Sequence, residues 1–450
     1  MKLHLTLSPD HPHTRYSLSS TLQGTSLPSN VALAPPETPV AAPLPPKRSV
    51  RHPVLRAILL LIPLYVLLVW CDAWFTKLPP LAGTPGPGER VGIVHVHTNA
   101  SCGSGSLSDV IADAKKAALS FLTVTDHNHA VSRAAIDAAD PPEFAVIPGE
   151  ELSTSSGHYL ALGITDTWPR GLSYDAHQLM ASTRAAGAVN FIAHPFGLRE
   201  KWRDWTVADY DGMEIFNDDA IWRKNTVFDL FNAFLLYPVD SRLALLRLAR
   251  TPHENLAKWD ELQKSRPVAG ICGSDAHAAI LMSGHIVAKF PGYIPVFSLI
   301  REHVLLPPSP AIDAGETSAD AILAALKNGN SFCSVDAIYP ADGFVESVTA
   351  TGSAASPSTI HAGPGNSIPF TSSAVFHVAV PAGAPSPMIR ILRDGQEIAR
   401  RQANSIDLPL PGPGLYRAEA YLRQPGITGW RRWTLWIVPN PVRVTAPTSQ

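Results

Sequence analysis

Histidines and carboxylates recur along this chain, and nearly all of them directly follow a short apolar segment. They are His95-Val-His97, Asp126-His127, Glu150-Glu151, His158, His194-Pro195 and Asp275-Ala-His277. Neutral imidazoles and carboxylates bind borderline-to-hard divalent cations, and two such ions about 3.5–4 Å apart can lower the pKa of a bridging water towards neutrality. The residue types therefore predict a hydrolytic centre that holds more than one metal ion.

One of these motifs alone would be a weak signal. The chain has 17 histidines among 450 residues, so roughly 0.6 His-x-His pairs are expected by chance. Chance does not readily place several ligand motifs after apolar segments in the same chain direction. The evidence for a metal site therefore comes from the whole set of motifs.

The apolar segments before the motifs predict buried strands. They are residues 91–94, 121–125, 144–147, 189–193 and 268–271. Residues 106–119 carry apolar side chains on one helical face and predict a helix that begins at Ser106 or Ser108, and residues 173–187 repeat this pattern. The carboxyl ends of parallel barrel strands meet at one end of the barrel. We therefore expect an α/β barrel whose ligands converge there.

The rest of the chain predicts further helices and then a second folded part. Residues 212–217 predict a strand, residues 218–266 predict mostly helix that covers one end of the barrel, and residues 319–327 predict a last helix before a strand at 331–335. After residue 340 the pattern alternates in the manner of β-strands with Gly/Pro turns, which predicts an antiparallel Ig-like β-sandwich over residues 345–445. Its expected strands lie at residues 374–380, 389–398 with an Asp394-Gly395 turn, 415–422 and 433–438.

The order of the ligand motifs resembles the PHP (polymerase and histidinol phosphatase) superfamily. The matching residues are His95-x-His97-Thr, Thr125-Asp-His127, Pro148-Gly-Glu-Glu151, His158, Ala193-His-Pro195, Glu214 and Gly273-Ser-Asp275-Ala-His277. The resemblance covers roughly residues 91–335 and assigns residues 91–340 to one metallohydrolase domain. It implies a distorted (β/α)7 barrel, two or three divalent ions among Zn, Mn and Fe, and hydrolysis of phosphoesters.

The resemblance also implies which residues hold the metals. These are His95, His97, His127, Glu151, His158, His194, Asp275 and His277. Glu151 occupies the family's position two residues after the Pro-Gly glycine, and Glu150 is the alternative. Where the family usually has an aspartate ligand in Ser-Asp-Gly, this chain has Ser101-Cys102-Gly103. Because a thiolate binds Zn but is softer than a carboxylate, Cys102 is a further candidate ligand that changes the expected metal, and a Cys102–Cys272 disulfide is its alternative.

Two residues near these motifs are candidates for catalytic roles. Asp126 would orient a ligand or move a proton. Arg199, which Lys201 and Arg203 follow, would bind phosphate oxygens. The alternatives are a structural role for Asp126 and a solvated basic turn around Arg199.

The N-terminal region predicts a membrane anchor. Residues 1–52 are rich in Pro, Ser, Thr and Ala and predict a disordered tail. Residues 53–75 predict a transmembrane signal anchor, with a buried helix of a soluble protein as the alternative, and residues 76–90 predict a linker. Basic residues before the anchor place the tail in the cytoplasm by the positive-inside rule; they are Lys47, Arg48, Arg51 and Arg56. The catalytic domain would then be periplasmic or extracellular, held by a single pass at the inner (plasma) membrane.

Composition limits the possible partners. A net charge of −2 gives no basis for specific nucleic-acid binding, and four cysteines are too few for a disulfide scaffold. We therefore expect a small-molecule substrate. The sequence predicts no particular oligomeric state.

The motifs and the resemblance together predict a membrane-anchored hydrolase in which a metal-bridged hydroxide attacks a phosphoester. Two C-terminal segments, residues 413–417 and 436–442, resemble the carbaryl-hydrolase-type (CehA/McbA) branch, which implies a carbamate or carboxylic ester as the alternative substrate. Cys102 motivates another alternative, a noncatalytic, metal-stabilised binding or sensor domain. Retention of the remaining ligand positions favours the enzyme.

Overall fold

The computed structural model of the protein describes most of the chain after residue 52. The described ranges are 53–81, 83–139, 144–165, 168, 174–198, 200–283, 286–288, 290–309, 317–351, 359–426 and 432–447. The chain divides into two compact units, residues 1–56 and 57–450. The tail predicted to be disordered, residues 1–52, lies outside the described residues.

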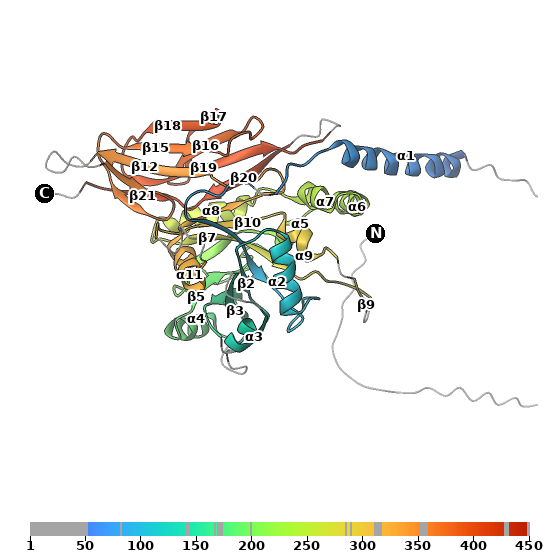
Figure 1. Ribbon diagram of the computed structural model, residues 1–450, viewed down its shortest axis with the longest axis horizontal. Coiled ribbons are helices and arrows are strands. Elements are labelled where there is room, and N and C mark those ends of the chain that lie inside the picture. The colour runs from blue at the N-terminus through green and yellow to red at the C-terminus, as the bar shows by residue number, and fades with distance from the viewer. Residues whose placement is uncertain are drawn as a thin grey trace, which may run out of the picture. The chain divides into compact units, whose positions relative to one another are not determined.

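Seven strands of the second unit close into a barrel (Figure 1). They are β1 (Glu89–Val96), β2 (Phe121–Val124), β3 (Ala145–Thr154), β4 (Gly157–Leu162), β5 (Val189–Ile192), β6 (Gly212–Asn217) and β7 (Ala269–Ala276). Each strand pairs with the next, and β7 pairs with β1. The pairs are parallel except those of β4 with β3 and β5. The expected distorted seven-stranded α/β barrel is confirmed.

Apolar side chains fill the barrel below the ends of its strands. Val94, Phe121, Phe191 and Ile271 belong to one buried cluster that also includes Leu326 of α11 (Ala319–Asn328). Glycine is required in two strands, because a Cβ on Gly92 or Gly212 would lie 2.3 Å from Phe121 or from the carbonyl of Ala269. The carboxyl ends of the strands are thus left for polar residues.

Helices cover the outside of the barrel as the periodicity predicts. α2 (Leu107–Lys116) begins with a capping box in which Ser106 and Asp109 bond each other's backbone N–H groups. α4 (Ala176–Ala185) is capped by Asp175 rather than by a serine. The mostly helical segment after β6 is confirmed as α5 (Asp218–Trp222), α6 (Val227–Leu236), α7 (Ser241–Leu248) and α8 (His253–Gln263), and the short helices α3 (Arg133–Ala139) and α9 (Tyr293–Phe297) complete this layer.

The barrel sheet continues into the C-terminal strands. β10 (Arg301–Leu305) pairs with β1, β11 (Ser331–Ser334) pairs with β10, and β20 (Trp433–Pro439) pairs with β11, all antiparallel. The other strands are β8 (Ile280–Ser283), β9 (Ile286–Ala288), β12 (Val345–Thr351), β13 (Thr359–Ala362), β14 (Ser367–Pro369), β15 (Val375–Ala379), β16 (Met388–Arg393), β17 (Gln396–Gln402), β18 (Ser405–Pro409), β19 (Gly414–Arg423) and β21 (Val442–Thr445).

The C-terminal strands form two antiparallel layers, drawn orange to red in Figure 1. One is β13-β12-β15-β18, and β16, β17, β19 and β20 belong to the other. β12 and β15 bury every second residue, as strands with one solvent-facing side do. Phe376 of β15 meets Tyr416 of β19 with ring centroids 6.1 Å apart. The predicted strands and the Asp394-Gly395 turn are present.

The predicted anchor corresponds to α1 (Pro53–Phe75). Trp70 donates a hydrogen bond to the carbonyl of Leu235 at 3.0 Å, and Asp72 pairs with Arg247 at 2.9 Å, so the end of α1 contacts α6 and α7. Within the described residues, no helix combines the length and the hydropathy that a membrane crossing needs. The expected transmembrane helix is therefore not supported.

Candidate metal centre

The predicted ligands meet at the carboxyl ends of the barrel strands. Three of them have left-handed backbone conformations, with φ of 66° at His95, 27° at His194 and 52° at Asp275. Such conformations cost on the order of 1–3 kcal/mol in residues other than glycine and are concentrated at functional sites. The register of β1 against β2 and β7 shifts around His95, which is the irregularity by which a bulge redirects a side chain.

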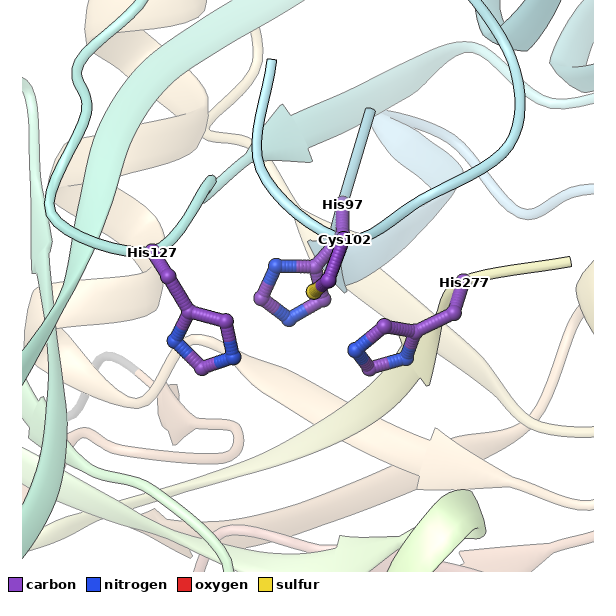
Figure 2. A group of neighbouring side chains, drawn as sticks. All are labelled: His97, Cys102, His127 and His277. Atoms are coloured by element: carbon purple, nitrogen blue, oxygen red, sulfur yellow. The ribbon is translucent and has the colours of Figure 1, made fainter. Parts of the chain in front are cut away.

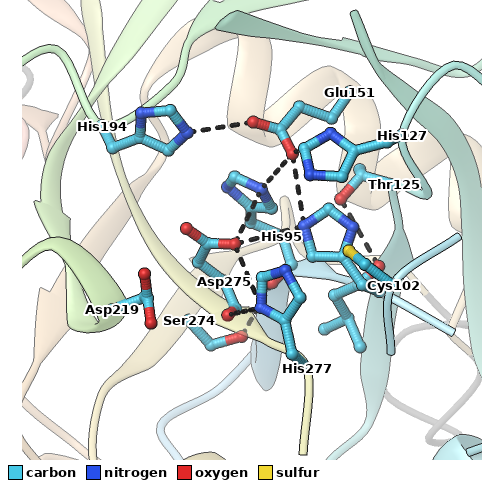
Figure 3. A network of polar contacts seen from close by, with 12 residues as sticks. His95, Cys102, Thr125, His127, Glu151, His194, Asp219, Ser274, Asp275 and His277 are labelled. Carbon is cyan, nitrogen blue, oxygen red and sulfur yellow. Dashed lines mark hydrogen bonds and ion pairs between the residues drawn. The ribbon is translucent and has the colours of Figure 1, made fainter. Parts of the chain in front are cut away.

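Glu151 lies fully buried in the middle of the ligands (Figure 3). Its Oε1 atom lies 2.8 Å from His158 Nδ1 and 2.9 Å from His194 Nε2. Three more imidazole nitrogens surround Oε2: His95 Nε2 at 3.1 Å, His97 Nε2 at 3.2 Å and His127 Nδ1 at 3.1 Å. His158 reaches the group because β4 runs antiparallel to β3 and begins where β3 ends.

The structure distinguishes Glu151 from its neighbour Glu150. Successive side chains of a strand point to opposite faces, and Glu150 accepts a hydrogen bond from the backbone N–H of Trp168 at 2.9 Å. Glu151 alone of the two faces the histidines. The choice of Glu151 over Glu150 is therefore supported by geometry.

The ligand atoms form overlapping groups in which all atoms lie within 4.8 Å of one another. These groups are His95, His97, Glu151 and Asp275; His127, Glu151 and His158; and His97, Cys102, His127 and His277. Ligands about 2.0–2.3 Å from one ion are separated from each other by at most about 4.6 Å. Each group is therefore about as compact as a single coordination sphere, and shared members place the groups side by side.

Cys102 completes the group that contains no carboxylate (Figure 2). Burial raises the pKa of its thiol, but hydrogen bonds to His127, His277 and His97 outweigh burial and lower the pKa to about 3. The sulfur is therefore a thiolate at neutral pH, the form that binds metal. Three imidazoles and one thiolate are ligands that Zn accepts.

The orphaned atoms of the cluster fit bound cations. Three buried atoms that point into it, His95 Nε2, His127 Nδ1 and Glu151 Oε2, make no well-aligned hydrogen bond, although both nitrogens lie 3.1 Å from the Glu151 oxygen. Leaving such atoms buried and unpaired is costly unless a ligand satisfies them. Divalent cations coordinated by these nitrogens and oxygens would do so.

The electrostatics of the cluster also call for positive charge. Burial lowers the pKa of His95, yet Asp275, Glu214 and Glu151 outweigh it and raise the pKa well above its ordinary value. Burial raises the pKa of Glu151, yet His95, His158 and His194 hold it well below the usual range. The carboxylates therefore favour positive charge on His95, and a divalent cation bound there would supply that charge with the imidazole neutral.

Two carboxylates outside the coordination groups position the ligands. Glu214 Oε1 lies 2.7 Å from His95 Nδ1, and its Oε2 accepts hydrogen bonds from the His194 backbone N–H at 2.5 Å and from Asn217 Nδ2 at 2.8 Å. Asp126 accepts hydrogen bonds from Thr98 N at 2.7 Å, Thr98 Oγ1 at 2.6 Å and Ser101 Oγ at 2.5 Å. Asp126 therefore holds the loop that carries Cys102, which is the structural role considered for it.

The structure places only two of the three basic residues considered as phosphate ligands. Arg199 lies outside the described residues. Lys201 and Arg203 are exposed, and neither lines the pocket over the ligands. Arg223 does line this pocket of about 140 Å³, together with Glu151, Asp275 and His277.

Sequence reasoning missed several polar residues of this pocket. Asp219 holds Arg223 through contacts of 2.5 and 3.0 Å, and both residues lie on the turn around α5. Glu200 lies 3.5 Å from His158 and belongs to a further potential ligand group with His194. No apolar strand directly precedes Glu200 or Arg223, so the pattern that revealed the other residues could not mark them. Asp219, two residues after β6, was detectable from its position.

The disulfide between Cys102 and Cys272, which the sequence offered as an alternative, is not formed. All four cysteines are free, and Cys102 is exposed whereas Cys272 is buried. The Cys272 thiol contacts Glu302 Oε2 at 3.0 Å and the carbonyl of Arg301 at 3.0 Å. Cys272 therefore belongs to the packing between β7 and β10.

Similarity to known proteins is limited. No protein-family model matches the chain. A stretch of 55 residues is 36% identical to an uncharacterized protein of Methanocaldococcus jannaschii, which corresponds to 12% of this chain and 22% of that protein. The chain thus spans about a fifth of the length of this relative.

Two solved structures are similar in fold. One is a two-domain protein from Bacteroides vulgatus that contains a predicted PHP-like metal-dependent phosphoesterase, with 12% identity, a TM-score of 0.39, and coverage of 80% of this chain and 98% of that chain. The other is a candidate metal-dependent phosphoesterase from Bifidobacterium adolescentis, with 15% identity, a TM-score of 0.28, and coverage of 41% and 87%. At such identities and TM-scores, neither similarity carries an inference about activity.

Proposed function

We propose that this chain is a metal-dependent hydrolase of the PHP type that cleaves phosphoesters. The observation that carries the proposal is the convergence of five imidazoles, from the ends of β1, β2, β4 and β5, on the two oxygens of Glu151. The strained backbone at His95, His194 and Asp275 supports it, because strain of this kind persists where function requires it.

Two or three divalent ions, Zn, Mn or Fe, bound by these residues would lower the pKa of a water molecule and polarise the substrate oxygen that gains charge. The protein's own contribution is orientation. Glu214 fixes the ring of His95, and Asp126 fixes the loop of Cys102. Such supporting contacts set the tautomer and direction of metal-binding imidazoles.

Arg223 is a candidate for the phosphate-binding role that the sequence suggested for Arg199, which lies outside the described residues. Its guanidinium borders the pocket above Asp275 and is held by Asp219. Arginine binds phosphate oxygens through paired N–H donors. We therefore assign Arg223 to the non-bridging oxygens of the phosphoester.

Metal analysis and turnover together test the proposed function. The full chain should hold at least two metals and hydrolyse bis(p-nitrophenyl) phosphate or p-nitrophenyl phosphate. His97→Ala should lower the metal content and reduce turnover by more than about a thousandfold, because its imidazole belongs to two ligand groups. His361→Ala, on an exposed strand of the sandwich, is the matched control and should change neither.

Each alternative has its own outcome in this experiment. Turnover of aryl esters or carbamates without turnover of phosphoesters would assign the chain to the ester-hydrolase alternative. Full metal occupancy with no turnover of any of these substrates would favour a metal-stabilised binding domain. Fewer than two metals per chain would remove the basis of the proposal.

We also propose that the catalytic unit works at the outer face of the inner membrane, held there by residues 53–75. Support comes from the basic residues before this segment and from its exposed apolar side chains, among them Leu60, Leu64 and Leu68. An alkaline phosphatase fusion after residue 90 should be active outside the cytoplasm. An inactive fusion would reject this placement.

A further inference from the structure

A large apolar cavity lies beside the metal centre. It has a volume of about 450 Å³ and is formed between α5, α6, α7, the end of β7 and the Phe290-Pro291 segment. Figure 1 shows α5, α6, α7 and α9 grouped at one side of the barrel. Cavities of about 300–1,000 Å³ hold small organic ligands. This cavity is about three times the size of the 140 Å³ pocket over the ligands.

The wall of the cavity is mostly hydrophobic. Its lining from α6 and α7 includes Leu230, Phe231, Phe234, Leu245 and Leu248. Val227, Phe231 and Phe234 are 84%, 48% and 64% exposed, so the cavity opens to the surface between apolar side chains. Apolar groups that face an open cavity gain free energy when an apolar ligand displaces water.

The inner end of this cavity reaches the metal ligands. Ser274, Asp275, Ala276 and His277 all contribute to its lining. Asp275 and His277 also line the pocket over Glu151, so one pair of ligands borders both spaces. A molecule bound at the metals therefore has the apolar cavity as its neighbour.

The acidic, basic and histidine residues that line the cavity are Asp218, Asp219, Arg223, Asp275 and His277, and all but Asp218 also line the pocket over Glu151. Asp219 and Arg223 line both, and they pair with each other at 2.5 Å. Figure 3 shows Asp219 on the side of Ser274 and Asp275. The polar pocket over Glu151 and the apolar cavity thus lie next to each other. This arrangement fits a ligand that has a polar group joined to an apolar group.

We infer that the substrate is an amphiphile, a phosphoester whose leaving alcohol or second ester group carries a long alkyl or acyl chain. The inference rests on the proposed function for the location of the reacting group. The phosphoryl group lies at the metal centre beside Arg223, and the apolar chain fills the cavity walled by α6 and α7. A small polar phosphoester would leave this cavity unused.

Binding of two non-hydrolysable probes tests the inference. Titration calorimetry compares methylphosphonate with dodecylphosphonate below its micelle concentration, on the full chain and at one fixed Mn²⁺ concentration. Because each buried methylene strengthens binding by about fourfold, dodecylphosphonate should bind at least 100-fold more tightly. A difference below threefold would overturn the inference.

Two matched pairs of variants on α6 test whether the alkyl chain of dodecylphosphonate binds in the apolar cavity. Leu230→Trp fills the cavity, whereas Leu235→Trp alters a leucine of the same helix that is also partly buried but does not line the cavity. The first should lower dodecylphosphonate affinity by at least tenfold and leave methylphosphonate unchanged, and the second should change neither. Equal effects of both variants would overturn the inference.

The second pair avoids crowding the core. Phe231→Ser removes an apolar wall residue, and Phe228→Ser alters a phenylalanine of similar exposure, 54%, that packs near Tyr65 instead. Only Phe231→Ser should weaken the long-chain probe. The two proposals fail in different ways. If the proposed function is wrong, metal or phosphoester turnover will be missing. If this inference is wrong, dodecylphosphonate and methylphosphonate will bind with similar affinity.

Discussion

His95 Nδ1 lies 2.7 Å from Glu214 Oε1, although the two residues are 119 positions apart in the chain. The contact joins the end of β1 to β6 and leaves His95 Nε2 directed at Glu151 and Asp275. A carboxylate on the far nitrogen fixes the ring and its tautomer for metal binding. Glu214 therefore acts on the metal through His95.

Glu214→Gln should weaken metal affinity by about 10–100-fold, the usual effect of losing such a supporting carboxylate. Metal titration followed by turnover at saturating metal checks this, and turnover should recover at least in part when metal is added. Glu346→Gln changes a buried glutamate of the sandwich and is the control for replacing a buried carboxyl group by an amide. Unchanged metal affinity in Glu214→Gln would show that the contact only fills space.

Cys102→Asp should shift the metal preference from Zn towards Mn. The substitution replaces a soft thiolate by a hard carboxylate among His97, His127 and His277. Turnover with each metal measures the shift, and we expect activity with Mn to be preserved or raised. Complete loss of metal binding in this variant would identify Cys102 as an indispensable Zn ligand.

A buried network away from the metals makes stability depend on pH. His303 Nδ1 lies 2.6 Å from Glu89 Oε1, and its Nε2 lies 3.4 Å from Asp336 Oδ2. Burial lowers the pKa of His303, but Asp336 and Glu89 outweigh burial and raise it to about 10. The pKa of His303 in the folded state thus exceeds the unfolded value of about 6.5. The network therefore contributes its full amount to the free energy of unfolding below about pH 6.5, and this contribution is lost as pH rises towards 10.

The free energy of unfolding should therefore fall between pH 7 and pH 10, on the order of a few kcal/mol from this network. Urea unfolding at several pH values measures the slope. His303→Gln should flatten it, whereas His377→Gln, which removes a half-exposed histidine paired with Asp407, should not. An identical slope in wild type and His303→Gln would contradict the prediction.

Asp260→Ala should destabilise the contact between the barrel and the sandwich. Asp260 of α8 pairs with Arg417 of β19, which is buried and also pairs with Glu419 at 2.9 Å. Removing Asp260 takes away the charged hydrogen bonds that it makes to Arg417 and leaves Glu419 as the carboxylate partner, which should cost about 1.5–3 kcal/mol. Thermal unfolding measures the loss, and Asp407→Ala, at an exposed pair, is the control with little expected effect.

Much of the fold was predictable because it follows from local patterns. The apolar runs before His95, His127, Glu151 and His194 proved to be strands β1, β2, β3 and β5, and the helix after Ser106 begins with the capping box that its sequence contains. A barrel was expected from the strand pattern, but its seven strands, with β7 paired to β1, followed only from the resemblance. Pairing between residues so distant in sequence depends on the packing of the whole barrel.

The sequence by itself determined the residue types and strand positions of the metal centre, because a ligand after a buried strand has few other roles. Only the tertiary structure decided that Glu151 lies among the histidines while Glu150 faces away, that Cys102 joins His97, His127 and His277, and that the apolar cavity opens beside Asp275. These relationships depend on strand alternation, loop course and helix packing across more than a hundred residues. Distances of a few ångströms between such residues are set by the folded core and have no counterpart in sequence spacing.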